Sequence, residues 1–321
     1  MNSLTTKELK SITRQRLAAA QYPPRKLTFL YSGITLGLSF LSVVLSWVTG
    51  LMMDSTGGLS GLGTRAILDT VSMVFSIAVQ IITPLLAMGF THCCIRIVRQ
   101  NDLRPKHLTM GPRRWAVILR HGLLVGAIFL VLAYLALQIA SIAFMFSSNW
   151  EHAMELMYGL MDDPAFMEGT VPMSTMTEMI RVFMPVYIIS AVLILVTFIP
   201  VSYRLRLSTY RILEEAPVGA ARAVLESNKL MKKHCVSLFK LDLSFWWFYV
   251  LQALPGLALY GIPLLVPLSD GWYVALCGVY SLAILVLQYY FFAYVQTTYA
   301  MFYQHMLETA VTPAQPQIEE S

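Results

Sequence analysis

The chain has 321 residues, of which 57% are hydrophobic and only 13% are charged. A soluble domain carries about 25% charged residues, so this composition leaves too little polar surface for a water-facing exterior. These values exclude an ordinary soluble domain and predict an all-α, polytopic membrane protein. The net charge of +5 is explained better by the placement of basic residues described below than by a nucleic-acid partner, which we do not expect.

Residues 1–26 are predicted to form a cytoplasmic amphipathic segment. Lys7, Lys10, Arg14 and Arg16 interrupt it, and it lacks the apolar core of a secretory signal. The pattern Thr5-x-x-Glu8 is typical of a capping box at the start of a helix. A short surface helix is therefore expected before the first membrane span.

Long apolar runs within residues 27–308 predict a bundle of six transmembrane helices. A helix needs about 20 apolar residues to cross the ~30 Å hydrocarbon core of a bilayer, and every run is at least that long. The expected spans are approximately residues 27–52, 67–98, 115–146, 179–205, 238–262 and 272–307.

Small residues recur at four-residue steps in the first span, as Gly33 and Gly37 and again as Ser42, Ser46 and Gly50. This spacing lets two helix backbones approach closely in lipid. We interpret it as packing within the chain in preference to a dimer motif.

Three polar segments are expected outside the spans. A glycine-rich loop covers residues 54–64, and a polar tail at 309–321 is predicted to be disordered in the cytoplasm. An external loop at 147–177 carries several acidic residues and is expected to hold two short amphipathic helices, broken near Asp163-Pro164 and Val171-Pro172.

The stretch 203–244 lies between two apolar runs and holds eight of the 23 basic residues. From Pro217, apolar residues recur at near-helical spacing (Ala220, Ala221, Val224, Leu225, Leu230 and Met231), while basic residues occupy the other side. This pattern predicts a cytoplasmic interfacial amphipathic helix over 217–233, with a basic face toward the membrane surface.

Several patches in this stretch also carry a resemblance: Tyr210, Glu215-Ala216-Pro217, Ala220, Ser227, Leu230-Met231-Lys232-Lys233-His234, Leu238-Phe239 and Leu241-Asp242-Leu243-Ser244-Phe245. Together they resemble the core motif of a bacterial integral-membrane family, the domain of unknown function 975. The opening Glu8-Leu9-Lys10 and the closing Tyr299-Ala300-Met301-Phe302-Tyr303 resemble its two ends. Lys233 stands where the family usually has glycine, and Glu215-Ala216 replaces the usual Asp-Asn. The resemblance implies a bacterial multi-span membrane protein without an assigned activity.

Lysine and arginine are distributed very unevenly over the predicted connections. In the six-span arrangement 21 of the 23 lie on one side, and only Arg65 and Arg181 lie on the other. By the positive-inside rule, both termini are expected in the cytoplasm of a bacterial plasma membrane. The basic side then faces the anionic lipid headgroups, which are the expected partners together with a protein partner.

The cysteines and nearby histidines offer a weak metal pattern. His92, Cys93, Cys94, His234 and Cys235 could share one membrane level, but adjacent helical residues diverge by roughly 100° and the usual C-x-x-C spacing is missing. We therefore predict no metal site and no cofactor. None of the four cysteines falls in a predicted external loop, so no disulfide framework is expected.

Asp242, at the start of the fifth predicted span, needs a charge partner. Lys240, Arg204 and Arg206 are within plausible reach. A structural ion pair is favoured over a role in proton or substrate coupling. The candidate structural, partner-contact or lipid-contact residues are Arg204, Arg206, Lys229, Lys232, Lys233, Lys240 and Asp242.

Three functions remain open at this point. The favoured hypothesis is a non-enzymatic membrane module that binds a protein partner or lipid through its basic surface helix and its acidic external loop. The first alternative is a transporter or permease component for a lipid, peptide or apolar solute. The second is a lipid-modifying membrane enzyme, which is disfavoured because the spans offer no clustered acid, base or metal set.

Overall fold

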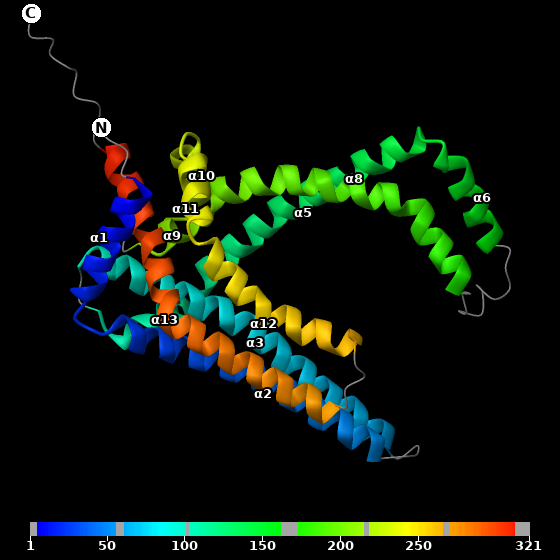
Figure 1. The fold of residues 1–321 in the computed structure, drawn as a ribbon, viewed down its shortest axis with the longest axis horizontal. Helices are drawn as coiled ribbons and strands as arrows, with labels where there is room; N and C mark the ends of the chain where they lie inside the picture. Colours follow the sequence, from blue (N-terminus) through cyan, green and yellow to red (C-terminus); the bar gives the residue numbers. More distant parts are fainter. Residues whose placement is uncertain are drawn as a thin grey trace, which may run out of the picture. The chain divides into compact units, whose positions relative to one another are not determined.

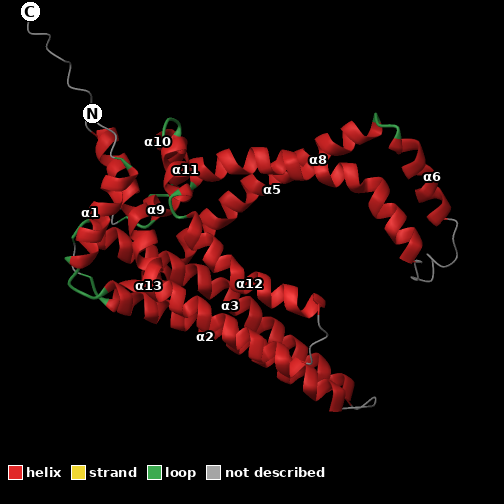
Figure 2. Cartoon of the chain, viewed as in Figure 1, coloured by secondary structure: helices red, strands yellow, loops and turns green. Residues whose placement is uncertain are grey.

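The structure is a computed structural model that describes residues 5–55, 61–100, 103–161, 173–214, 218–265 and 270–311. Over these ranges the chain is helical and contains no strand (Figure 2). The elements are α1 (Thr6–Ala18), α2 (Pro24–Ser55), α3 (Gly61–Val98), the 3-10 helix η1 (Pro105–Thr109), α4 (Met110–Arg113), α5 (Trp115–Met145), α6 (Asn149–Met161), α8 (Met173–Leu205), α9 (Ser208–Ile212), α10 (Ala220–Met231), α11 (Cys235–Leu243), α12 (Trp246–Leu265) and α13 (Asp270–Val311).

Five described helices are long and apolar enough to cross a membrane. They cover Pro24–Gly50, Ala66–Val98, Trp115–Met145, Thr175–Ile212 and Gly271–Thr309. Each coincides with a predicted span, with ends that differ by at most seven residues. The helical fold expected from the sequence is therefore confirmed over the described residues, and the five apolar helices indicate a multi-pass membrane protein.

The chain divides into two compact units. One unit, here called the core unit, combines residues 1–120 with residues 206–321. The other, here called the arm unit, covers His121–Leu205.

In the core unit, the long helices α2, α3 and α13 pack on one another, and α12 packs on α13 (Figure 1). Aromatic rings fill their common interior, where the ring of Tyr31 lies 5.0 Å from that of Phe90 and 5.5 Å from that of Phe292. Serine side chains join α2 to α3, since Ser42 and Ser76 lie 3.1 Å apart. Interhelical contacts of this kind are typical of helices that pack in lipid.

The first helix, α1, packs against α13 at one end of this bundle. Its start is a capping box, as predicted: the Thr5 hydroxyl accepts from the Glu8 backbone N–H, and the Glu8 carboxylate accepts from the Thr5 backbone N–H at 2.7 Å. Leu9, 3% exposed, buries the inner face of the helix.

The arm unit is built from α5, α6 and α8. A small core forms where α6 packs on α8, around Phe144, Ala153 and Val186, each less than 9% exposed. One of the two short helices expected within 147–177 is thus present as α6. The rest of the external loop, 162–172, lies outside the described residues, together with Pro217, residues 56–60 of the glycine-rich loop and residues 312–321 of the tail.

The predicted fifth span is not one continuous helix. The structure has α11 and α12 instead, separated at Ser244 and Phe245. The break is stabilised from outside, because Lys10 Nζ donates to the Ser244 carbonyl at 3.0 Å and lies 4.1 Å from the centre of the Phe245 ring. A lysine that approaches from α1 satisfies a carbonyl that no helical N–H reaches.

The predicted amphipathic helix over 217–233 is present as α10, but its buried seam differs. Ala223, Val224, Ser227 and Met231 are buried, and α10 packs on α9 and α13. Ala221 and Leu225, which we expected on the apolar face, are exposed. Of the predicted apolar stripe, Val224 and Met231 are buried against the protein, and Ala220 and Leu230 are half-buried.

The glycines of the first span also differ from expectation. A Cβ atom added at Gly33 or Gly37 would meet no described atom within 4 Å, so these two residues do not mark a close contact within the chain. The close contacts lie instead at Gly89, where a Cβ would lie 1.9 Å from the Leu108 carbonyl oxygen, and at Gly111, where it would lie 1.7 Å from that of Leu85.

We expect Gly89→Ala to lower the free energy of unfolding by about 1–3 kcal/mol, because the added methyl group collides with backbone that cannot rotate away. The measurement is thermal or SDS-induced unfolding in detergent, followed by circular dichroism. Gly37→Ala is the matched control and should leave stability unchanged or slightly higher, since alanine is the better helix former. Equal stability of the two variants would contradict the close contact.

Candidate functional site

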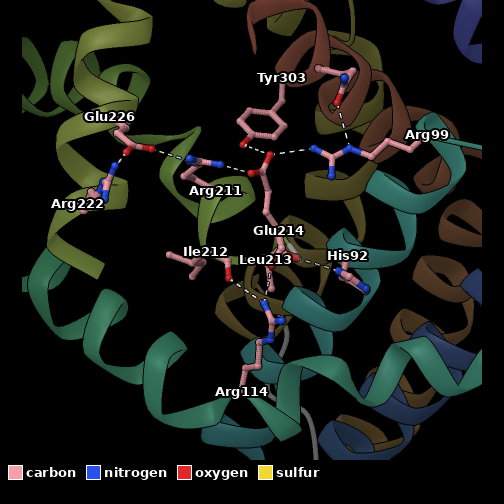
Figure 3. Close-up of polar contacts among 11 residues, drawn as sticks. His92, Arg99, Arg114, Arg211, Ile212, Leu213, Glu214, Arg222, Glu226 and Tyr303 are labelled. Atoms are coloured by element: carbon pink, nitrogen blue, oxygen red, sulfur yellow. Dashed lines mark hydrogen bonds and ion pairs between the residues drawn. The ribbon is translucent and has the colours of Figure 1, made fainter. Parts of the chain in front are cut away.

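A buried carboxylate, Glu214, lies where α3, α9 and α13 meet (Figure 3). Its side chain is only 9% exposed. One oxygen accepts from Arg99 Nη2 at 2.8 Å and from the Tyr303 hydroxyl at 2.7 Å, and the other accepts from Arg211. Two guanidinium groups and a phenol thus compensate a charge that would otherwise be costly to bury.

The backbone around Glu214 is held by side chains as well. The chain leaves α9 at Ile212. Arg114 Nη1 donates to the Glu214 carbonyl at 2.7 Å, and His92 Nδ1 donates to the Leu213 carbonyl at 3.0 Å. His92 of α3 and Arg114, between α4 and α5, therefore fix the segment that carries the carboxylate (Figure 3).

The same network reaches α10 through Glu226. Arg211 Nε donates to one Glu226 oxygen at 2.5 Å, and Arg222 Nε donates to the other at 2.8 Å. The hydrogen bond from Arg211, supported by Arg222, holds the pKa of Glu226 below its ordinary value. Arg211 thus connects two carboxylates and ties α10 to α9.

Asp242, on α11, forms a second network. Its Oδ2 accepts from Arg206 Nη1 at 2.5 Å, and its Oδ1 accepts from the Tyr299 hydroxyl at 2.6 Å. The Tyr249 and Tyr299 hydroxyls lie 2.6 Å apart, and the Arg206 guanidinium lies 4.3 Å from the centre of the Tyr299 ring. Arg206 is therefore the partner of Asp242 among the three basic residues within expected reach.

Lys10 lies beside this second network. Its ammonium contacts the Ser244 carbonyl and the Phe245 ring, as described above, which places it between α1 and the break before α12. Partial burial, with a further contribution from nearby Arg14, lowers the pKa of Lys10.

The remaining sequence-predicted site residues lie on the surface. Arg204 and Lys240 are exposed, as are Lys229, Lys232 and Lys233. The last three lie together and line one cavity of ≈ 370 Å³ with Leu230, His234, Met306 and Thr309. We call this cavity the basic groove. The structure thus divides the predicted set into an internal pair, Arg206 and Asp242, and a group that opens to the outside.

The cysteine and histidine residues do not gather. Cys93 and Cys94 are fully buried, and Cys235 donates its thiol to the Met231 carbonyl at 3.1 Å. All four cysteines are free. Over the described ranges, no group of three or more His, Cys, Asp or Glu side chains is arranged to hold a metal ion.

The Glu214 network was not predicted from the sequence. Its members come from three segments that are far apart in the chain. In the sequence, each looks like an ordinary polar residue at a helix end, and nothing shows that they meet. One signal was present: Glu214-Glu215 is an acidic pair inside a connection that is otherwise strongly basic. An acidic side chain in such a place calls for a specific partner.

We expect Glu214→Gln to lower the free energy of unfolding by about 3 kcal/mol, because Arg99 and Arg211 lose the carboxylate that compensates them. This is the low end of the range for a broken buried pair, since both arginines keep about a quarter of their side-chain surface exposed. SDS-induced unfolding in mixed micelles measures the change. The control is Glu155→Gln on the exposed face of α6, and a similar loss in both variants would contradict the buried role of Glu214.

Comparison with known proteins identifies a family for the chain, and that family has no assigned function. No curated protein and no solved structure matches the chain. A family model described as "Protein of unknown function (DUF975)" matches residues 1–310, which include both networks and the basic groove. The chain therefore belongs to the DUF975 family.

Proposed function

We propose that this chain is a non-enzymatic module of a bacterial cell membrane that binds an acidic segment of a protein partner. The basic groove is the observation that carries this proposal. Lys229, Lys232, Lys233 and His234 line a single cavity of ≈ 370 Å³, whose wall is completed by residues near the end of α13. A cavity lined by several cationic side chains favours an anionic ligand.

The described ion pairs of the core unit do not involve the lysines of the groove. The ion pairs of the core unit join arginines to Glu214, Glu226 and Asp242. No described residue forms an ion pair with Lys229, Lys232 or Lys233, and all three are exposed. A ligand that brings carboxylates would therefore supply the counter-charge.

An acidic protein segment fits this groove better than a lipid headgroup layer does. α10 packs on α9 and α13 and buries Val224 and Met231, so these two apolar side chains of its stripe cannot enter acyl chains. The groove is also hollow and has apolar walls from Leu230 and Met306, which suit an extended chain. The buried carboxylates, in contrast, accept from several donors each and act as fixed links between helices.

The placement of the module in the membrane is part of the proposal. In it, α12 follows α11 as a sixth span, since its 20 residues reach about 30 Å as a helix. Six spans put both termini in the cytoplasm, with 21 of the 23 basic residues on that side. The basic groove and α10 then lie at the cytoplasmic surface of the membrane, and α6 lies outside.

Photo-crosslinking in native membranes tests the partner. A benzophenone amino acid at Thr309, on the wall of the groove, should give a crosslinked protein band. We expect the triple variant Lys229→Gln, Lys232→Gln and Lys233→Gln to lose this band at least tenfold. Mass spectrometry of the band should identify a partner with an acidic segment.

A matched triple variant separates the groove from net charge. The variant Lys7→Gln, Lys106→Gln and Arg113→Gln removes the same number of charges from exposed positions outside the groove and should keep the band. A band that both triple variants lose would point to general charge and contradict a specific groove. Crosslinks to anionic lipid in place of protein would assign the groove to headgroups.

The break between α11 and α12 favours one second candidate, a transporter component. Discontinuous helices commonly form the sites of secondary transporters, and this break lies two residues from Asp242. Vesicles that contain the purified protein should then take up a labelled lipid or peptide faster than empty vesicles. Equal uptake for the substrates tested counts against this candidate.

A further inference from the structure

A second cavity, away from both charge networks, opens between α2 and α13. It has a volume of ≈ 790 Å³, which lies within the range of about 300–1,000 Å³ that is typical of small-molecule sites. We call it the lateral groove. Both of its helices are long and apolar enough to cross a membrane, so the groove belongs to the part of the chain that contacts lipid.

The two helices run antiparallel along the groove. The Arg25 guanidinium lies 5.8 Å from the centre of the Tyr290 ring, and Ser32 donates to the Gln288 side chain at 2.5 Å. Further along, the ring of Phe40 lies beside Gly278. Rising numbers on α2 therefore correspond to falling numbers on α13.

This alignment gives the lateral groove two chemically different ends. Lys26 and Tyr22 line one end together with Tyr289 and Tyr290 of α13. Leu30, Leu282, Leu285 and Val286 line the other end, deeper into the apolar part of both helices. One end thus offers a cation and phenol hydroxyls, and the other offers only hydrocarbon.

We propose that the lateral groove binds an anionic phospholipid of the surrounding bilayer. The phosphate lies at Lys26, with tyrosine hydroxyls as further donors, and one acyl chain runs along the leucine and valine side chains. Basic residues beside a groove between membrane helices are known to recognise anionic headgroups. A free phosphate would use only the Lys26 end and would leave the apolar end unfilled.

Several side chains of the lateral groove face outward. Phe29 and Tyr290 are 54% and 55% exposed, and Leu282 is 63% exposed. The groove is thus open along its side, and a lipid can enter from the bilayer without passing through the protein. A lipid bound there would cover aromatic and aliphatic surface that no described part of the chain covers.

The experiment uses the purified full chain in nanodiscs with a photoactivatable phosphatidylglycerol that carries a diazirine in its acyl chain. Mass spectrometry maps the adducts. We expect them to concentrate on residues 282–290 of α13, about fivefold above those of a matched phosphatidylcholine analogue, the factor expected for one basic residue at an anionic lipid. Equal labelling by both analogues, or labelling spread evenly over the exposed faces of α5 and α8, would overturn the site.

Two pairs of variants sharpen the result. Lys26→Gln should remove the headgroup preference, while Lys7→Gln, an exposed lysine on α1, should keep it. Leu285→Trp should fill the apolar end and reduce labelling by both analogues, while Val279→Trp, on the same helix but outside the groove, should not. If Leu285→Trp does not fold, the Lys26→Gln variant alone tests the site. The Lys26 side chain is exposed, so we expect this variant to fold. Unchanged preference in Lys26→Gln would overturn the inference.

The lateral groove shares the membrane placement of the proposed function but does not depend on the basic groove. The triple variant at Lys229, Lys232 and Lys233 should therefore label as the wild type does. If no protein partner is found at the basic groove, the lipid labelling of α13 still tests the lateral groove independently. If a photo-crosslinking amino acid at position 285 instead links two copies of the chain, the lateral groove is a contact between copies, and the lipid proposal is wrong.

Discussion

A carboxylate that is almost fully buried must be matched by donors, and Glu214 has three of them from three elements. Arg99 comes from the end of α3, Arg211 from α9, and Tyr303 from α13. Because Glu214 follows α9 directly, this charge fixes where the chain goes after the fourth predicted span. The position of α10, tied to Arg211 through Glu226, depends on the same link.

Asp242 is a second carboxylate that is matched by donors from other elements of the same part of the chain. It joins α11 to Arg206, before α9, and to Tyr299 on α13. The two networks share α13 as a common support, since Tyr299 and Tyr303 lie one helical turn apart on it. One face of α13 therefore supplies a phenol to each buried carboxylate. The polar connection between the fourth and fifth predicted spans is thus attached to the bundle at two points along one helix.

The sequence predicts those features of this fold that depend on neighbours in the chain. The Thr5–Glu8 capping box and the apolar runs of the spans are local patterns, and they carry enough information to place α1 and the long helices. The need of Asp242 for a partner also follows from its position, although three arginines or lysines qualified. The local pattern could not predict the contact at Ser244, because the side chain that bonds its carbonyl is Lys10, more than two hundred residues earlier. The buried side of α10 was predicted only in part for a similar reason, because it depends on the packing of α9 and α13. The role of Glu214 depends on the same two helices.

Arginine and lysine have separate roles in the core unit, and the chemistry of their head groups explains why. Arg99, Arg206 and Arg211 each direct a planar fork of donors at a carboxylate, and Arg99 and Arg211 each contact a second acceptor as well. A guanidinium suits this task because it is rigid, weakly hydrated and always charged. Lys229, Lys232 and Lys233, in contrast, keep their ammonium groups exposed around one cavity. An ammonium is strongly hydrated and flexible, so it stabilises a folded interior poorly but can adjust to a ligand that arrives from outside. The links to the buried carboxylates are therefore made by arginine, and the exposed positive charge around the basic groove is carried by lysine.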